Sequence, residues 1–438
     1  MRQLKPLTRL TTARGFSTTL RRWEIRDLSA LEDRVAPSFQ ETAHHDLLSL
    51  QWPCPPRNIL VARKEGSKRV NEALLEYTRH IQSTYPDTQL IFEPKVAQEY
   101  HEALKQPIYA PSTPSPSLLQ SKVDLITTLG GDGTILHAAS LFATTTNVPP
   151  ILSFSMGTLG FLGEWKFQEY KRAFREVYMS GAGAGDRSPI LDPSSSHHRG
   201  SMGDAADRTL SGWSSVRGKS MGKSRGSRVL LRNRLRVGIF APDGSRVAHD
   251  GDPDSQDTAE GVASGDVYAM NEVLLHRGRT PHLSQIQIFL GGRFLTEAVA
   301  DGMLISTPTG STAYSLSAGG SIVHPLVSSL LLTPICPRSL SFRPLVLPAN
   351  TPIVLRLSEK NRAEEVEVSV DGVRRSRGLK RGMEVRVVGE DIKTVDGWKG
   401  GIPSVVRTGA SGGYEGEDHW VGGLNGLLKF NYPFGEDG

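Results

Sequence analysis

The chain contains 438 residues, of which 38% are hydrophobic and 22% are charged, a composition that predicts a globular protein of two or three domains. Of the net charge of +5, residues 1–16 contribute +4 and residues 181–228 another +4, so the rest of the chain carries −3. This distribution excludes a basic nucleic-acid-binding surface. No apolar run is long enough to span a membrane.

The first 16 residues have the composition of a mitochondrial transit peptide. Arginine, serine and threonine are frequent there, and the first acidic residue of the chain is Glu24. The sequence Arg14-Gly15-Phe16-Ser17 resembles the cleavage site of precursors that are processed in the mitochondrial matrix, with the cut after Phe16. We therefore expect matrix localisation, the alternative being a disordered basic tail. Residues 17–56 are polar and are expected to be irregular.

Residues 57–180 alternate between strand and helix patterns. Such alternation predicts a Rossmann-like parallel α/β domain with helices on both faces of the sheet. A proline-rich loop is expected at 108–119. The expected strands are 58–62, 88–92, 123–129 and 150–154, and the expected helices are 67–84, 95–104, 135–142 and 166–178.

The sequence after residue 180 predicts a second, mainly antiparallel β domain. Residues 181–227 are rich in Gly, Ser and Arg and predict a disordered insertion. Strand patterns recur over 228–400, beginning with a continuous run at 229–240, and a polar loop is expected at 243–265. The aromatic segment within 401–438 is expected to pack back on the first domain.

The sequence Gly130-Gly131-Asp132-Gly133-Thr134 follows a buried strand and precedes a helix. Glycines at such a turn let a polyphosphate approach the backbone, and the helix N-terminus favours negative charge. A carboxylate in that place would repel phosphate unless it holds Mg²⁺ or accepts a proton from an attacking hydroxyl. The motif therefore indicates phosphoryl transfer, the alternative being a turn in which Asp132 caps the helix.

Three further motifs lie in the β-rich part. Asn271-Glu272 interrupts an otherwise apolar strand, so at least one buried polar side chain there needs a partner. Asp301-Gly302 is followed by a run of hydroxyls and glycines, 307–320, that opens a short helix. Asp371-Gly372 ends a strand, and taken alone it predicts only a hairpin turn.

These four motifs, in this order, resemble the NAD kinase family, whose members use ATP to make NADP from NAD. The resemblance runs from about Asn58 to Phe434, without the two polar insertions. It implies ATP as the phosphoryl donor, Mg²⁺, NAD or NADH as the acceptor, and a homo-oligomer. The sequence contains neither the GxxxxGK[ST] phosphate loop nor the GxGxxG dinucleotide fingerprint.

The resemblance also implies roles for individual residues. Asp132 would accept the proton of the 2′-hydroxyl of the adenosine ribose, and Asn271 and Glu272 would hold the adenosine part of NAD. Asp301 would contact the other end of the dinucleotide. The ATP polyphosphate would lie near Gly131, Gly133 and Thr134, and the adenine and ribose pocket would be lined by Thr309, Thr312, Tyr314 and Ser317.

Two other functions remain open at this stage. A lipid kinase of the diacylglycerol type shares the glycine turn, but it would not account for Asn271-Glu272 or the segment from Thr309 to Tyr314. A non-catalytic NAD-binding sensor would have no need of Asp132. The sequence does not distinguish NAD from NADH as the acceptor.

Overall fold

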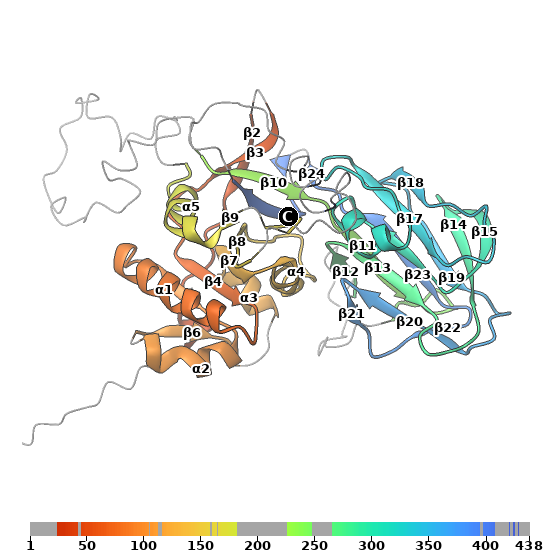
Figure 1. The fold of residues 1–438 in the computed structure, drawn as a ribbon, viewed down its shortest axis with the longest axis horizontal. Helices are drawn as coiled ribbons and strands as arrows, with labels where there is room; N and C mark the ends of the chain where they lie inside the picture. Colours follow the sequence, from red (N-terminus) through yellow and green to blue (C-terminus); the bar gives the residue numbers. More distant parts are fainter. Residues whose placement is uncertain are drawn as a thin grey trace, which may run out of the picture.

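The computed structural model has an N-terminal α/β domain and a C-terminal β domain, which lie side by side (Figure 1). The predicted transit peptide, most of 181–227, most of 243–265 and most of 408–438 lie outside the described residues. The structure describes residues 24–42, 45–104, 106–112, 116–157, 160–163, 165–181, 226–247, 265–394 and 397–407, with 420, 424 and 428.

An eleven-stranded sheet forms the centre of the N-terminal domain, with the order β1-β6-β5-β4-β7-β8-β26-β10-β3-β2 and with β9 beside β8. Neighbouring strands from β1 to β26 are parallel, whereas β10, β3 and β2 are antiparallel. The strands are β1 (Ile25–Asp27), β2 (Ser38–Thr42), β3 (His45–Gln51), β4 (Asn58–Arg63), β5 (Gln89–Ile91), β6 (Ile108–Ala110), β7 (Leu125–Gly130), β8 (Ile151–Ser155), β9 (Trp165–Lys166), β10 (Arg228–Arg232) and β26 (Ile402–Val406).

Helices cover both faces of this sheet, because alternate residues of each central strand point to opposite sides. Ile59 and Val61 of β4 belong to one buried cluster, and Leu60 belongs to the cluster on the other face. The helices are α1 (Lys68–Thr84), α2 (Pro94–Leu104), α3 (Pro116–Lys122), α4 (Asp132–Ser140) and α5 (Tyr170–Tyr178), with the 3-10 turns η1 (Leu28–Ala30) and η2 (Phe167–Glu169).

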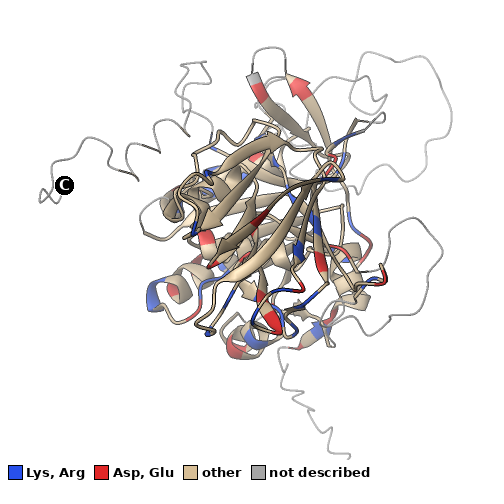
Figure 2. Ribbon diagram, turned by 90° about the vertical axis from the view of Figure 1, so that its right-hand side faces the viewer, with Lys and Arg blue, Asp and Glu red and all other residues tan. Residues whose placement is uncertain are grey.

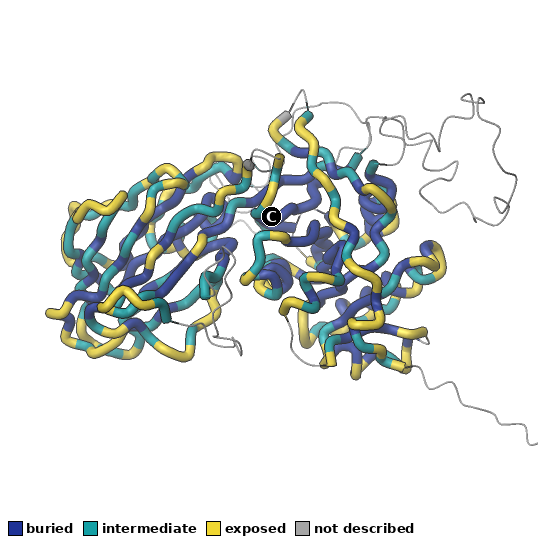
Figure 3. The backbone as a smooth tube through the Cα atoms, turned by 180° about the vertical axis from the view of Figure 1, so that it is seen from behind, coloured by how far each residue is buried: buried dark blue, intermediate teal, exposed yellow. Residues whose placement is uncertain are grey.

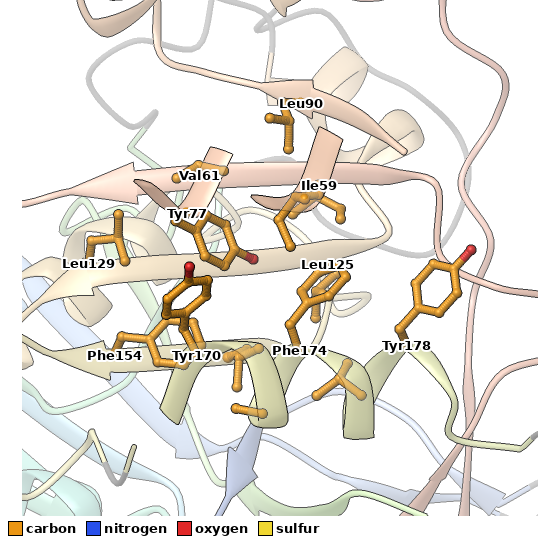
Figure 4. Close-up of a cluster of buried hydrophobic side chains, with 14 of the residues drawn as sticks. Ile59, Val61, Tyr77, Leu90, Leu125, Leu129, Phe154, Tyr170, Phe174 and Tyr178 are labelled. Carbon is orange, nitrogen blue, oxygen red and sulfur yellow. The ribbon is translucent and has the colours of Figure 1, made fainter. Parts of the chain in front are cut away.

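The helix α1 shows how the sequence pattern becomes a packed core. Its apolar residues recur every three or four positions, and Tyr77 at the middle of that face is fully buried. The Tyr77 ring lies between the sheet and α5, with ring centroids 5.9 Å from Phe154 and 6.1 Å from Phe174 (Figure 4). Its hydroxyl is 2.9 Å from that of Thr127, so the buried polar group has a partner.

The C-terminal domain consists of two packed antiparallel sheets with one apolar core between them. In Figure 3 the buried backbone is concentrated in the strands of both domains. One sheet has the order β12-β11-β23-β19-β14-β15, and the other has the order β18-β17-β16-β13-β20-β21, with β22 beside β20. The elements are β11 (Leu235–Phe240), β12 (Val267–Ala269), β13 (Glu272–His276), β14 (Ser284–Leu290), β15 (Arg293–Ala300), β16 (Gly302–Ser306), η3 (Thr309–Thr312), α7 (Tyr314–Ser317), β17 (Ser329–Ile335), β18 (Leu345–Pro348), β19 (Ile353–Leu357), β20 (Glu365–Val370), β21 (Val373–Arg374), β22 (Leu379–Lys380) and β23 (Glu384–Gly389), followed by the hairpin β24 (Lys393–Thr394) and β25 (Gly397–Trp398).

The predicted fold class is confirmed, but several boundaries differ from the expectations. Residues 24–51 are not irregular, because they supply β1, β2 and β3 to the sheet, and 108–119 contains β6 and the start of α3. β1 and β6 have only three residues each and β2 is largely polar, so partner strands far along the chain stabilise these strands rather than local propensity. The run 229–240 is two strands in different sheets, so the second domain begins at β11 and not at 228.

The end of the described chain returns to the first domain. The strand β26 lies between β8 and β10 in the N-terminal sheet. The aromatic segment that follows is described only at isolated positions, where the Trp420 ring lies 4.7 Å from the His324 ring of the second domain. The packing of that segment on the first domain therefore stays a prediction.

Charged residues of both signs are interspersed over the elements visible in Figure 2. None of the helices in the described part of the chain is both long and apolar enough to cross a membrane. Both cysteines, Cys54 and Cys336, are free, in agreement with the sequence interpretation.

Candidate active site

Asp132 is the first residue of α4, directly after β7 and Gly131. Its carboxylate does not cap the helix. Instead it accepts hydrogen bonds from the backbone N–H groups of Phe161, at 2.9 Å, and Leu162, at 3.2 Å. These donors, 29 and 30 residues further along the chain, therefore hold the carboxylate in one orientation at the carboxyl end of the parallel sheet, where open α/β sheets bind their ligands.

Gly160 makes this arrangement possible. A Cβ atom added there would lie 2.5 Å from Cγ and 2.6 Å from Oδ2 of Asp132, closer than real Cβ contacts. The loop can therefore approach the carboxylate only with glycine at this position. The repeated glycines of 157–163 could have indicated a close approach of this loop to another group. Nothing local in the sequence identifies Asp132 as that group.

The glycines of the motif border open space. A Cβ at Gly131 or Gly133 would meet no atom of the described residues within 4 Å, so packing against these residues does not require glycine at either position. Both border a cavity of about 610 Å³ together with Thr134. Two glycines facing an open cavity at a helix N-terminus fit a polyphosphate chain that approaches the backbone.

Basic side chains surround this cavity, and sequence reasoning did not identify them. They lie at the end of β4, directly after it, or on α2 and α4, so their gathering depends on the sheet. His137 is hydrogen-bonded to Glu93 at 2.9 Å, and this carboxylate raises the pKa of the imidazole. The cavity is lined by the basic residues Arg63, Lys64, Lys95 and His137 and by the acidic residues Glu65 and Glu93.

Asn271 directly precedes β13 and Glu272 is the first residue of that strand; they are 7% and 9% exposed. The Oδ1 atom of Asn271 and the Oε2 atom of Glu272 are buried and have no hydrogen-bond partner among the described residues. Unpaired buried acceptors are costly, so a bound molecule that donates hydrogen bonds would relieve them. Burial, with Asp371 nearby, raises the pKa of Glu272 to about 7.

Asp371 positions this pair, a role that its hairpin motif did not reveal. Its carboxylate accepts hydrogen bonds from the N–H groups of Met270 and Asn271, both at 2.7 Å, and of Glu272, at 3.1 Å. The predicted turn is present, since β20 and β21 pair across Asp371 and Gly372. Asp371 adopts a φ of +47°, a conformation that aspartate tolerates better than most residues. Burial raises the pKa of its carboxyl group, against the three N–H donors.

The hydroxyl-rich segment packs directly on Asn271. The Thr307 N–H donates to the carbonyl of Asn271 at 2.8 Å. A Cβ at Gly310 would lie 2.6 Å from the same carbonyl carbon, so glycine is required there. Thr309 is buried, the Thr312 hydroxyl donates to the Thr309 carbonyl at 3.2 Å, and Tyr314 and Ser317 on α7 are exposed.

Met270 connects the two halves of the site. It directly precedes Asn271, and it belongs to the same buried cluster as Ile135 of α4 and Leu162 of the loop that holds Asp132. The helix that begins with Asp132 and the residue before Asn271 therefore share one buried core, and the meeting of the two halves at a single site stays a prediction.

Asp301 is the exception among the expected site residues. It precedes β16, whereas Thr307 follows that strand, so six residues or roughly 20 Å of extended chain separate them. Its carboxylate pairs with Arg277 at 2.5 Å. Asp301 was expected at the other end of the dinucleotide, so this separation does not contradict its role, which stays a prediction.

Comparisons with known proteins identify the family to which the chain belongs. Residues 61–182 match the ATP-NAD kinase N-terminal domain, and residues 270–393 match the ATP-NAD kinase C-terminal domain. The mitochondrial NADH kinase pos5 of Schizosaccharomyces pombe is 37% identical over 94% of this chain and 87% of its own length. The chain belongs to the NAD kinase family.

Other relatives extend the similarity. The mitochondrial NADH kinase POS5 of Saccharomyces cerevisiae is 34% identical over 94% of this chain and 89% of its own. The crystal structure of yeast NADH kinase complexed with NADH has a TM-score of 0.70 and 33% identity, and the match covers 95% of this chain and 100% of that chain. Membership of the NAD kinase family disfavours the lipid-kinase and sensor alternatives.

Proposed function

We propose that this protein transfers the γ-phosphoryl group of ATP to the 2′-hydroxyl of the adenosine ribose of NAD(H). The observation that carries the proposal is the Asp132 carboxylate, which two backbone N–H groups hold beside Gly131 and Gly133, the glycines that border an open cavity lined by basic side chains. In the second domain, Asn271 and Glu272 present buried acceptors that have no partner among the described residues and that suit ribose hydroxyls.

In this mechanism, Asn271 and Glu272 hold the ribose while Asp132 accepts the proton of the 2′-hydroxyl. The hydroxyl oxygen bonds to the γ-phosphorus, and the bond to the leaving ADP oxygen breaks. A positioned general base contributes about 10²- to 10⁴-fold to such a rate. The N–H groups at the start of α4 and the basic side chains of the cavity would stabilise the phosphates.

Mg²⁺ would enter with ATP. In such sites the phosphates and water supply most of the ligands of Mg²⁺, and the ion neutralises charge on the transferred group. In the described part of the chain, no three His, Cys, Asp or Glu side chains are grouped to hold a metal ion. The open space beside Gly131 and Gly133 fits a polyphosphate that brings the ion.

The test is NADP(H) formation by the purified full-length chain with ATP and Mg²⁺, with NAD and NADH compared as acceptors. We expect NADH to be preferred, because both fungal relatives named above are NADH kinases. Asp132→Asn should abolish turnover but leave the Kd for NADH within about threefold. The reason is that Asp132 serves as the proton acceptor, whereas other residues form the nucleotide pocket. The matched control is Asp33→Asn, which removes a carboxylate that pairs with Lys122. Normal turnover by the Asp132 variant would refute the mechanism.

We further propose localisation in the mitochondrial matrix and assembly as a homo-oligomer. The basic segment 1–16 and the mitochondrial relatives support the first proposal. Exposed apolar side chains on the outer strands β15 and β18 support the second, with Phe294 58% and Val346 52% exposed. Import into isolated mitochondria tests the localisation, and exclusion from the matrix would refute it. Light scattering of the purified protein tests the assembly, and a monomeric mass would refute it.

A further inference from the structure

Two buried charged residues lie where the chain crosses between the domains. Arg234 separates β10 of the N-terminal sheet from β11 of the C-terminal domain, and Glu390 follows β23 on the way back to β26. Their side chains form a forked ion pair, with Nη2 to Oε1 at 2.7 Å and Nε to Oε2 at 2.8 Å. The two side chains are only 2% and 4% exposed.

The same pair joins the backbones of the two crossings. The Glu390 N–H donates to the Arg234 carbonyl at 2.8 Å, and the Gly401 N–H donates to Glu390 Oε2 at 2.8 Å. Removing two charges from water is costly, so a buried ion pair is weak evidence of a contribution to stability. A fully hydrogen-bonded fork does define geometry, because planar guanidinium and carboxylate groups meet in few orientations.

The remaining donors of Arg234 reach the end of α4. Its Nη1 donates to the Phe142 carbonyl at 3.3 Å, and its Nη2 donates to the Thr145 carbonyl at 2.9 Å. These carbonyls follow the C-terminal end of the helix that begins with Asp132. A cation is favoured there, since the helix dipole places partial negative charge at the C-terminus.

The face of the guanidinium contacts the other half of the site. Its carbon lies 4.3 Å from the centre of the Tyr268 ring, in β12. The Tyr268 N–H also donates to the Ala143 carbonyl at 2.8 Å, directly between the domains. Tyr268 is only three residues before Asn271, so Arg234 contacts both the segment that follows α4 and the strand that precedes Asn271.

We propose that the Arg234-Glu390 pair is a positioning pair that holds Asp132 in register with the ribose bound at Asn271 and Glu272. The nine residues of α4 span roughly 13 Å, so a tilt of about 5° about the C-terminal end would move Asp132 by about 1 Å. A displacement of that size can reduce the rate about 100-fold. The inference rests on the proposed kinase activity.

The test is Arg234→Lys, which keeps the charge and loses the fork. We expect kcat to fall about 10- to 100-fold, while the Kd for NADH stays within about threefold, because Asn271, Glu272 and Asp371 are hydrogen-bonded within one domain. A purely structural role would lower the melting temperature without this separation of kcat from Kd. The control is Arg356→Lys, which alters the Arg356-Glu384 pair within the six-stranded sheet and should leave kcat unchanged.

Glu390→Gln keeps the shape of the side chain and removes its charge, so it provides a second measurement if the lysine variant fails to fold. Wild-type kcat in a folded variant, or a Kd that rises in proportion to the loss of kcat, would overturn the inference. Absence of activity in the wild-type protein would instead refute the proposed function, so the two failures are distinguishable.

Discussion

Gly160→Ala should impair catalysis with little effect on folding or nucleotide binding. The added Cβ would lie 2.5 Å from Cγ of Asp132, whereas an ordinary contact needs at least about 3.4 Å. The loop or the carboxylate must therefore move by about 1 Å. The two N–H groups that hold the carboxylate, on Phe161 and Leu162, directly follow the substituted residue, so the carboxylate loses its orientation.

A misplacement of this size corresponds to a rate loss of about 100-fold, or about 2.7 kcal/mol in the activation free energy. The assay is steady-state NADPH formation with ATP and NADH, with kcat and KM separated. Gly163→Ala, in the same loop, is the matched control, because its Cβ would make an ordinary contact of 3.5 Å with Ile135 of α4. If Gly160→Ala kept the wild-type kcat, close approach of this loop would not control the carboxylate.

Two further predictions concern the dinucleotide side. The pKa of Glu272 rises from 4.5 when the chain is unfolded to about 7, so stability present below pH 4.5 should be lost as pH rises to 7, by about 3 kcal/mol. Denaturant titrations from pH 4.5 to 8 should show this slope in the wild type and not in Glu272→Gln; equal slopes would contradict it. Asp371→Asn can adopt the same positive φ but presents an amide donor to one backbone N–H, so KM for NADH should rise about tenfold. An unchanged KM would mean that Asp371 does not position Asn271.

Much of the N-terminal domain could be predicted because its signals are local. The buried face of α1 follows from residues three and four apart, and the glycine turn at Asp132 follows from a strand and a helix that adjoin it in sequence. The motifs at Asn271 and Thr309 were likewise identifiable as polar segments in apolar surroundings. The sequence by itself therefore determined the fold class and the family, and it nominated the glycine turn and the nucleotide-binding residues, whose roles stay predictions.

Tertiary structure decided which distant groups meet. Asp371 lies 101 residues from Met270, and Arg234 lies 156 residues from Glu390, yet each pair is within hydrogen-bond distance. The strand β2 and the split of 229–240 depend in the same way on partner strands from elsewhere in the chain. The physical reason is that a buried carboxylate or a polar edge strand is stabilised by its partners, and the chain order alone does not state which partners the sheets bring together.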